Sequence, residues 1–155
     1  MNTNRVLLAT LLILILSTAA FSQGASPRCN IRSAVGAYGY SCTGVAPNPF
    51  DGFKVEPFAA YGYVFGDGAG QWNGYGKVSF NGAIARWTHN TRKTEPAVVN
   101  PDCTGSVTYE VTVGGVAVPD AHFEYVIVNN GAEVKGFPID PGYAVSCQLI
   151  LEKHQ

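Results

Sequence analysis

Short runs of aromatic and β-branched residues, separated by glycine and proline, are the feature that most constrains how this chain can fold. The sequence contains 18 glycines and 9 prolines, and between them Val, Ile, Tyr, Phe and Thr alternate with small or polar residues. Strict alternation is typical of strands with one buried face, and the glycines and prolines mark the turns. Because no helical period follows the amino-terminal segment, the pattern predicts an all-β chain.

Alternation and turn signals together predict eight strands. They cover residues 33–45, 58–65, 71–81, 83–91, 106–113, 121–128, 132–139 and 143–152. The proline-containing segments 46–57 and 90–102 are predicted as loops, with 97–100 extended. Mostly short turns and no intervening helices favour an antiparallel meander.

An eight-stranded meander can close on itself, which removes the exposed edges that invite aggregation. We therefore predict a single antiparallel meander β-barrel, with a two-sheet β-sandwich as the alternative. The interior of such a barrel is either filled by side chains or holds one small ligand.

The amino terminus has the order of parts of a signal peptide. Arg5 precedes an apolar stretch from Val6 to Leu16, and small residues follow around Ala20 and Ser22. The apolar stretch is too short for a transmembrane helix, which needs about 20 residues. We expect cleavage near Ser22 and a secreted or periplasmic product without a membrane anchor. The predicted organisation is a signal peptide at 1–22, an extension at 23–32 and a barrel domain at 33–153.

Four cysteines lie after the predicted cleavage site, and an even number in an exported chain indicates two disulfides. They are Cys29, Cys42, Cys103 and Cys147. Of the three possible pairings we rank the local one first, Cys29 with Cys42 and Cys103 with Cys147. The other pairings require the short amino-terminal segment to reach further across the domain. No two cysteines have the spacing of a zinc site, so neither a metal nor a cofactor is predicted.

The charge balance bears on possible partners. The chain has 10 Lys and Arg against 11 Asp and Glu, and losing Arg5 leaves a net charge of about −2. Nucleic acids and anionic membranes select basic patches, so neither is a predicted partner. The cluster of Arg86, Arg92 and Lys93 is interpreted as a solvated loop.

Aromatic residues are frequent in the predicted strands. Rings with polar tips could line a pocket for a small apolar ligand, and the candidate ligand-binding residues are Tyr61, Tyr63, Tyr109, Phe123 and Tyr125.

Few other residues suggest chemistry. His122 and Glu124 lie two apart on one strand face and form an alternative polar pair, although we favour a solvent-facing interpretation. His89, close to Arg86 and Trp87, could mark a barrel mouth, but beside a predicted loop it is interpreted as a surface residue. Asp102 is interpreted as the organiser of a turn. Serine-nucleophile and phosphate-loop motifs are absent from the sequence, and no catalytic residue is predicted.

Four stretches carry a resemblance to a known family. They are YGYVFGDGAG at 61–70, NPDCTGS at 100–106, HFEYVIV at 122–128 and DPG at 140–142. The chain resembles small exported bacterial proteins of the allene oxide cyclase barrel-like group, within the calycin-like β-barrels. The resemblance covers about residues 33–153 and implies a barrel and bacterial export. In true allene oxide cyclases a carboxylate and an ordered water act in an apolar cavity on a fatty-acid epoxide. No position here matches that carboxylate, and Glu110 and Glu124 lie on the polar faces of their strands.

Two functional hypotheses follow. The first is an exported, non-catalytic module that binds a small apolar or aromatic ligand, or an unidentified protein partner. The second is a cyclase or isomerase-like barrel enzyme acting on a hydrophobic substrate. An ionisable side chain inside the cavity, with Glu110, His122 and Glu124 as the candidates, would favour the enzyme.

Overall fold

A computed structural model describes residues 28–152 of the chain. The predicted signal peptide, residues 1–22, lies outside this range. The described strands are β1 (Gly36–Asn48), β2 (Lys54–Gly66), β3 (Trp72–Phe80), β4 (Ala83–Thr91), β5 (Val98–Val99), β6 (Thr104–Val113), β7 (Val116–Val128), β8 (Glu133–Pro138) and β9 (Ala144–Leu151). Two short 3-10 helices, η1 (Ile31–Ala34) and η2 (Asn129–Gly131), accompany them. Within the described residues no helix is long and apolar enough to cross a membrane.

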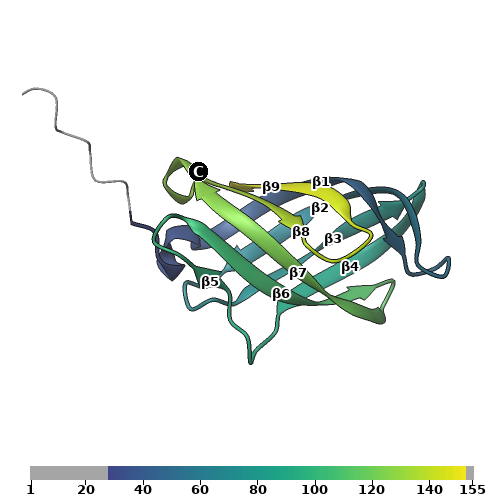
Figure 1. The fold of residues 1–155 in the computed structure, drawn as a ribbon, viewed down its shortest axis with the longest axis horizontal. Helices are drawn as coiled ribbons and strands as arrows, with labels where there is room; N and C mark the ends of the chain where they lie inside the picture. The colour runs from purple at the N-terminus through teal and green to yellow at the C-terminus, as the bar shows by residue number, and fades with distance from the viewer. Residues whose placement is uncertain (1–27, 153–155) are drawn as a thin grey trace, which may run out of the picture.

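The strands form a closed antiparallel meander (Figure 1). β1 to β4 pair in order, β6 to β9 pair in order, β4 pairs with β6, and β9 pairs with β1. The additional strand β5 pairs with the start of β6. The prediction of a single eight-stranded meander barrel is thereby confirmed.

The predicted loop over 46–57 is too long. β1 and β2 pair as far as Asn48 and Lys54, so Pro47 and Pro57 are strand residues. The pairing of β1 with β9 ends at Val45, and that of β2 with β3 begins at Phe58. Both prolines therefore lie just outside the pairing with the second neighbouring strand, where a missing N–H is tolerated.

The predicted local disulfide pairing is wrong. The structure joins Cys29 to Cys103 and Cys42 to Cys147. Cys42 and Cys147 are directly opposite each other in the pairing of β1 with β9, so barrel closure brings the first and last strands together. The Cys29 backbone N–H donates to the Pro101 carbonyl at 3.2 Å, which places the amino-terminal segment beside the loop before β6.

One end of the barrel is closed by the amino-terminal segment. Ala34, the last residue of η1, is fully buried. The Tyr38 hydroxyl donates to the Gly131 carbonyl at 2.7 Å and ties β1 to η2. The other end, where β1 meets β2 and β8 meets β9, holds the entrance described below.

Two glycines make room for a buried tyrosine inside the barrel. Gly62 of β2 and Gly76 of β3 are paired, and a Cβ added to them would lie 2.7 and 2.4 Å from the Tyr40 hydroxyl oxygen. At Gly62 the added Cβ would also approach the Tyr75 carbonyl oxygen to 2.1 Å. Side chains at these positions are therefore excluded by the backbone as well as by Tyr40.

Gly62→Ala is expected to lower the free energy of unfolding by about 2 to 3 kcal/mol, because the rigid backbone must shift to admit the methyl group. Gly39→Ala is the matched control, since its Cβ would meet only the flexible Glu152 side chain at 3.4 Å. Urea denaturation checks both variants. Equal losses of stability would contradict this account of Gly62.

Candidate functional site

The barrel interior contains two adjoining cavities. The inner one has a volume of about 60 Å³ and the outer one about 50 Å³, measured as space open to the centre of a water molecule. Both are lined by the Cys42–Cys147 disulfide and by Trp87, Val111 and Phe123. By this measure one water needs about 10–15 Å³, so each cavity has room for several waters or a small organic group.

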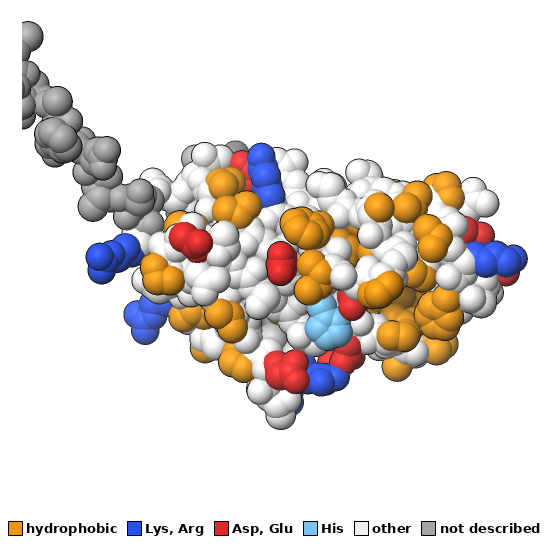
Figure 2. Space-filling view, viewed as in Figure 1, with side chains coloured by type: hydrophobic (Ala, Val, Ile, Leu, Met, Phe, Trp, Pro, Cys, Tyr) orange, Lys and Arg blue, Asp and Glu red, His pale blue; other side chains and the backbone are white. Residues whose placement is uncertain are grey.

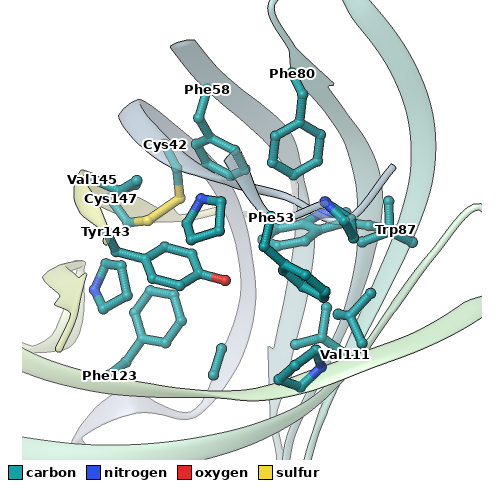
Figure 3. Close-up of a pocket in the computed structure, with 17 residues that line it drawn as sticks. Cys42, Phe53, Phe58, Phe80, Trp87, Val111, Phe123, Tyr143, Val145 and Cys147 are labelled. Carbon is teal, nitrogen blue, oxygen red and sulfur yellow. A yellow bond between two sulfur atoms is a disulfide. The ribbon is translucent and has the colours of Figure 1, made fainter. Parts of the chain in front are cut away.

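The outer cavity forms the entrance (Figure 3). Its lining includes Phe53 from the loop between β1 and β2, Pro119 from β7 and Tyr143 from the loop before β9. Figure 3 shows Phe58, Phe80, Trp87 and Phe123 around the same space. The lining contains no Lys, Arg, Asp or Glu, so an entering molecule meets an apolar surface.

The inner cavity is an aromatic chamber. Its rings are Tyr40, Trp72, Trp87, Tyr109, Phe123 and Tyr125. The indole N–H of Trp87 donates to the Tyr40 hydroxyl, and the Tyr125 hydroxyl donates to the Val98 carbonyl of β5 at 2.8 Å. Burial raises the pKa of Tyr40 to about 12 and also raises the pKa of Tyr109 and Tyr125. These phenols are therefore neutral at physiological pH.

His89 is the ionisable residue that the sequence interpretation misplaced. It is 6% exposed and lines the inner cavity, so its interpretation as a surface residue is wrong. The ring centroids of Tyr40, Trp87 and Tyr109 lie 5.1–5.3 Å from that of the imidazole. Gly74, its partner on β3, leaves space for the ring, because a Cβ there would lie 2.3 Å from Nε2.

Two buried polar atoms of the inner cavity's lining residues have no hydrogen-bond partner among the described residues. They are Nδ1 of His89 and Nε1 of Trp72. Desolvation lowers the pKa of His89 to about 4, so the imidazole is neutral at pH 7. Buried polar atoms in native proteins almost always have a partner, and exceptions often mark a site where a water or ligand binds. Two residues that line the inner cavity therefore carry a nitrogen that forms no hydrogen bond within the described part of the protein.

The five ligand-binding residues predicted from the sequence divide into two groups. Tyr109, Phe123 and Tyr125 line the inner cavity. Tyr61 and Tyr63 lie on the outer face of β2 with exposures of 60% and 46%. Alternation along β2 places Phe58, Ala60 and Val64 inside instead.

The predicted polar pair lies on the outside of the barrel. His122 Nδ1 lies 2.7 Å from Asp140 Oδ1, and Glu124 is exposed. Glu110 is also exposed, with its Oε1 3.9 Å from Arg92 Nε. None of the three lines either internal cavity.

Asp102 organises its turn, as expected from the sequence, because its Oδ1 accepts from the Thr104 N–H at 3.0 Å.

In residues 28–152 no group of three His, Cys, Asp or Glu side chains is arranged to hold a metal ion.

His89 could have been recognised from the alternation of its own strand. It lies two residues after Trp87 and two before the buried Thr91, so all three share a face. Its register partner on β3 is Gly74. A ring opposite a glycine can lie over the position that a side chain would otherwise occupy.

Comparison with protein-family models, curated proteins and solved structures finds no match to this chain.

Proposed function

We propose that this protein is a binding module that holds a small, uncharged, aromatic or otherwise hydrophobic ligand in the inner cavity of its barrel. The observation that carries the proposal is the inner cavity itself, which is lined by rings and aliphatic side chains and includes two residues whose buried nitrogens have no partner, His89 at Nδ1 and Trp72 at Nε1. Small-molecule sites commonly combine a mostly apolar wall with a few polar groups that orient the ligand.

The charge of the cavity defines the class of ligand. Neither cavity is lined by Lys, Arg, Asp or Glu, and His89 is neutral at pH 7 because burial lowers its pKa to about 4. An ionised ligand would lose its hydration without gaining a counter-charge. A ring that carries a hydroxyl or carbonyl group can form a hydrogen bond with a buried nitrogen, and it does not lose the hydration of a charge.

Binding is favoured over catalysis by the position of the candidate acids and bases. Glu110, His122 and Glu124 face outward, so the carboxylate that a cyclase-like mechanism requires does not come from these residues. His89 is the titratable imidazole of the inner cavity, and its surroundings are aromatic rings.

The proposed place of action is outside the cytoplasm, in the periplasm or the extracellular medium. Two disulfides join the described cysteines, and disulfides persist mainly in oxidising compartments. The amino-terminal sequence of Arg5, an apolar stretch and small residues supports the same proposal.

Binding can be tested with 4-methylphenol and toluene, which differ by one hydroxyl group, using the fluorescence of Trp72 and Trp87 and isothermal titration calorimetry. Wild-type protein is expected to bind both, and 4-methylphenol more tightly. His89→Leu removes the unpartnered nitrogen and is expected to weaken 4-methylphenol binding by about fivefold to tenfold, without weakening toluene binding.

His122→Leu is the matched control, because it removes the exposed histidine of the outer face. It should leave both affinities unchanged. Failure of the wild-type protein to bind either probe at millimolar concentration would overturn the proposal. A His89→Leu variant that binds 4-methylphenol as well as the wild type would show that the imidazole does not orient the ligand.

A further inference from the structure

Exposed tyrosine and basic side chains lie together on the outer surface of β2, β3 and β4. We call this set the tyrosine–cation face, and it consists of Tyr61, Tyr63, Tyr75, Lys77 and Arg86. Tyr61 is paired with Lys77, and Lys77 with Arg86, so these three form one row across the strands. Tyr63 and Tyr75 are paired in the next row, with ring centroids 6.3 Å apart. Alternate residues of a strand share a face, so all five side chains point away from the interior.

The stability of the fold does not account for this arrangement. Like charges directly opposite each other on neighbouring strands are destabilising, and Lys77 and Arg86 occupy such positions. Neither forms an ion pair with an acidic side chain in the described part of the chain. A pair of tyrosines across two strands does stabilise a sheet, but the partner of Tyr61 is a lysine. A bound anion would relieve the repulsion between the two cations, so the pair indicates an acidic ligand.

The acidic side chains of the barrel strands lie mainly on the opposite wall. The acidic residues of β6, β7 and β8 are Glu110, Asp120, Glu124 and Glu133. Figure 2 shows acidic side chains spread over this wall. β1 to β4 hold one acidic residue, Glu56, which precedes the start of the β2–β3 pairing at Phe58 and accepts from Asn48 at 2.8 Å. The wall formed by β2, β3 and β4 is therefore the basic side of a chain whose net charge is −1.

The form of this face favours one kind of acidic polymer. β2 and β3 are paired on both sides here, so an acidic peptide finds no free strand edge on which to extend the sheet. Nucleic-acid binding relies on neutralising many phosphates, and the face offers two cations. A polysaccharide of uronic acids carries a carboxylate on each sugar, which lysine and arginine bind. Its sugar rings also have C–H surfaces that pack against aromatic rings.

We propose that the tyrosine–cation face binds an acidic polysaccharide with carboxylate-bearing sugars. Lys77 and Arg86 bind the carboxylates, while the exposed tyrosine rings pack against the sugars. Neighbouring strands lie about 4.8 Å apart, which is close to the length of one sugar unit. Successive sugars of a chain that crosses the strands therefore meet Tyr61, Lys77 and Arg86 in turn. None of the residues of this face lines either internal cavity, so the proposal does not depend on the proposed ligand-binding function.

Isothermal titration calorimetry with polygalacturonate tests the proposal. Dextran serves as a neutral polysaccharide, and polyglutamate and oligothymidylate serve as other acidic polymers. The mature protein is expected to bind polygalacturonate more tightly than each of these by about tenfold or more. Lys77→Gln with Arg86→Gln is expected to weaken polygalacturonate binding by about tenfold. Lys93→Gln with Lys135→Gln is the matched control, because it changes the net charge equally at exposed positions outside the face. It should retain the wild-type affinity.

A second pair of variants tests the rings. Tyr61→Ser with Tyr75→Ser is expected to weaken polygalacturonate binding by about tenfold. These tyrosines are 60% and 66% exposed. Phe137→Ser is the matched control, since Phe137 is 51% exposed on β8, and it should bind like the wild type. The Lys77 and Arg86 variant should unfold at a urea concentration no lower than the wild type, because it removes a pair of like charges.

Four results would overturn the proposal. The first is wild-type protein that does not bind polygalacturonate at millimolar carboxylate concentration. The second is an equal loss of affinity in the Lys93 and Lys135 control, which would reflect net charge alone. The third is binding of dextran, polyglutamate or oligothymidylate as tight as that of polygalacturonate. The fourth is a lower urea midpoint in the Lys77 and Arg86 variant, since the two cations would then support the fold.

Discussion

Replacing both Cys42 and Cys147 by alanine is expected to lower the free energy of unfolding by about 5 kcal/mol. The bridge spans 105 residues and joins the first barrel strand to the last. In the chain-entropy model, a cross-link that closes a long loop mainly destabilises the unfolded state. Both cysteines are also buried, at 5% and 4% exposure, so the variant loses packing inside the barrel as well.

The matched control is the double alanine variant at Cys29 and Cys103. This bridge spans 74 residues, so its loop-closure contribution is similar, but its cysteines are only partly buried and it holds the amino-terminal segment. We expect a loss about 1 kcal/mol smaller than for the Cys42 and Cys147 variant. Urea denaturation without reductant measures both. A larger loss in the control would show that the amino-terminal segment, and not the seam between β1 and β9, limits stability.

Acidification from pH 7 to pH 4 is expected to cost about 3 kcal/mol of stability through His89 alone. Burial lowers the pKa of His89 from 6.5 to about 4 in the folded state. Between these values the unfolded chain binds a proton that the folded chain does not, so stability falls as the pH falls. The contribution is fully present above pH 6.5 and lost as the pH approaches 4.

The variant His89→Leu isolates this effect. It cannot bind the proton in either state, so its stability difference between pH 7 and pH 4 should be smaller than that of the wild type by about 3 kcal/mol. His122→Leu, which removes an exposed histidine, should keep most of the wild-type difference. Denaturant unfolding at the two pH values measures all three proteins. An unchanged difference in His89→Leu would mean that the imidazole titrates normally in the folded state.

Much of the fold could be predicted from local patterns. The predicted strand at 83–91 coincides with β4, and the predicted strand at 106–113 differs from β6 by only two residues at its start. The glycine-rich turn after β2 was also recognised. Errors occur at Pro47 and Pro57, where the effect of a proline depends on whether a neighbouring strand is present. The predicted strand at 121–128 also omits the first five residues of β7 (Val116–Val128).

The candidate site was harder to predict than the fold. Tyr109, Phe123 and Tyr125 were placed among the ligand-binding candidates and do line the inner cavity, whereas His89 was assigned to the surface. Alternation along β4 places His89 on the same face as Trp87 and Thr91, but alternation alone does not say which face is buried. Its environment is made by Tyr40 of β1, which does not pair with β4, and by Tyr109 of β6, which does.

The sequence by itself determined the strands, their turns and the antiparallel meander, because alternation and glycine-rich turns are properties of neighbouring residues. Tertiary structure alone decided which face of each strand turned inward. A two-residue period shows that the faces differ without saying which is buried, and the narrow interior admits Ala60 and Val64 of β2 while Tyr61 and Tyr63 remain outside. Only barrel closure, which brings β9 against β1, could decide that Cys42 meets Cys147.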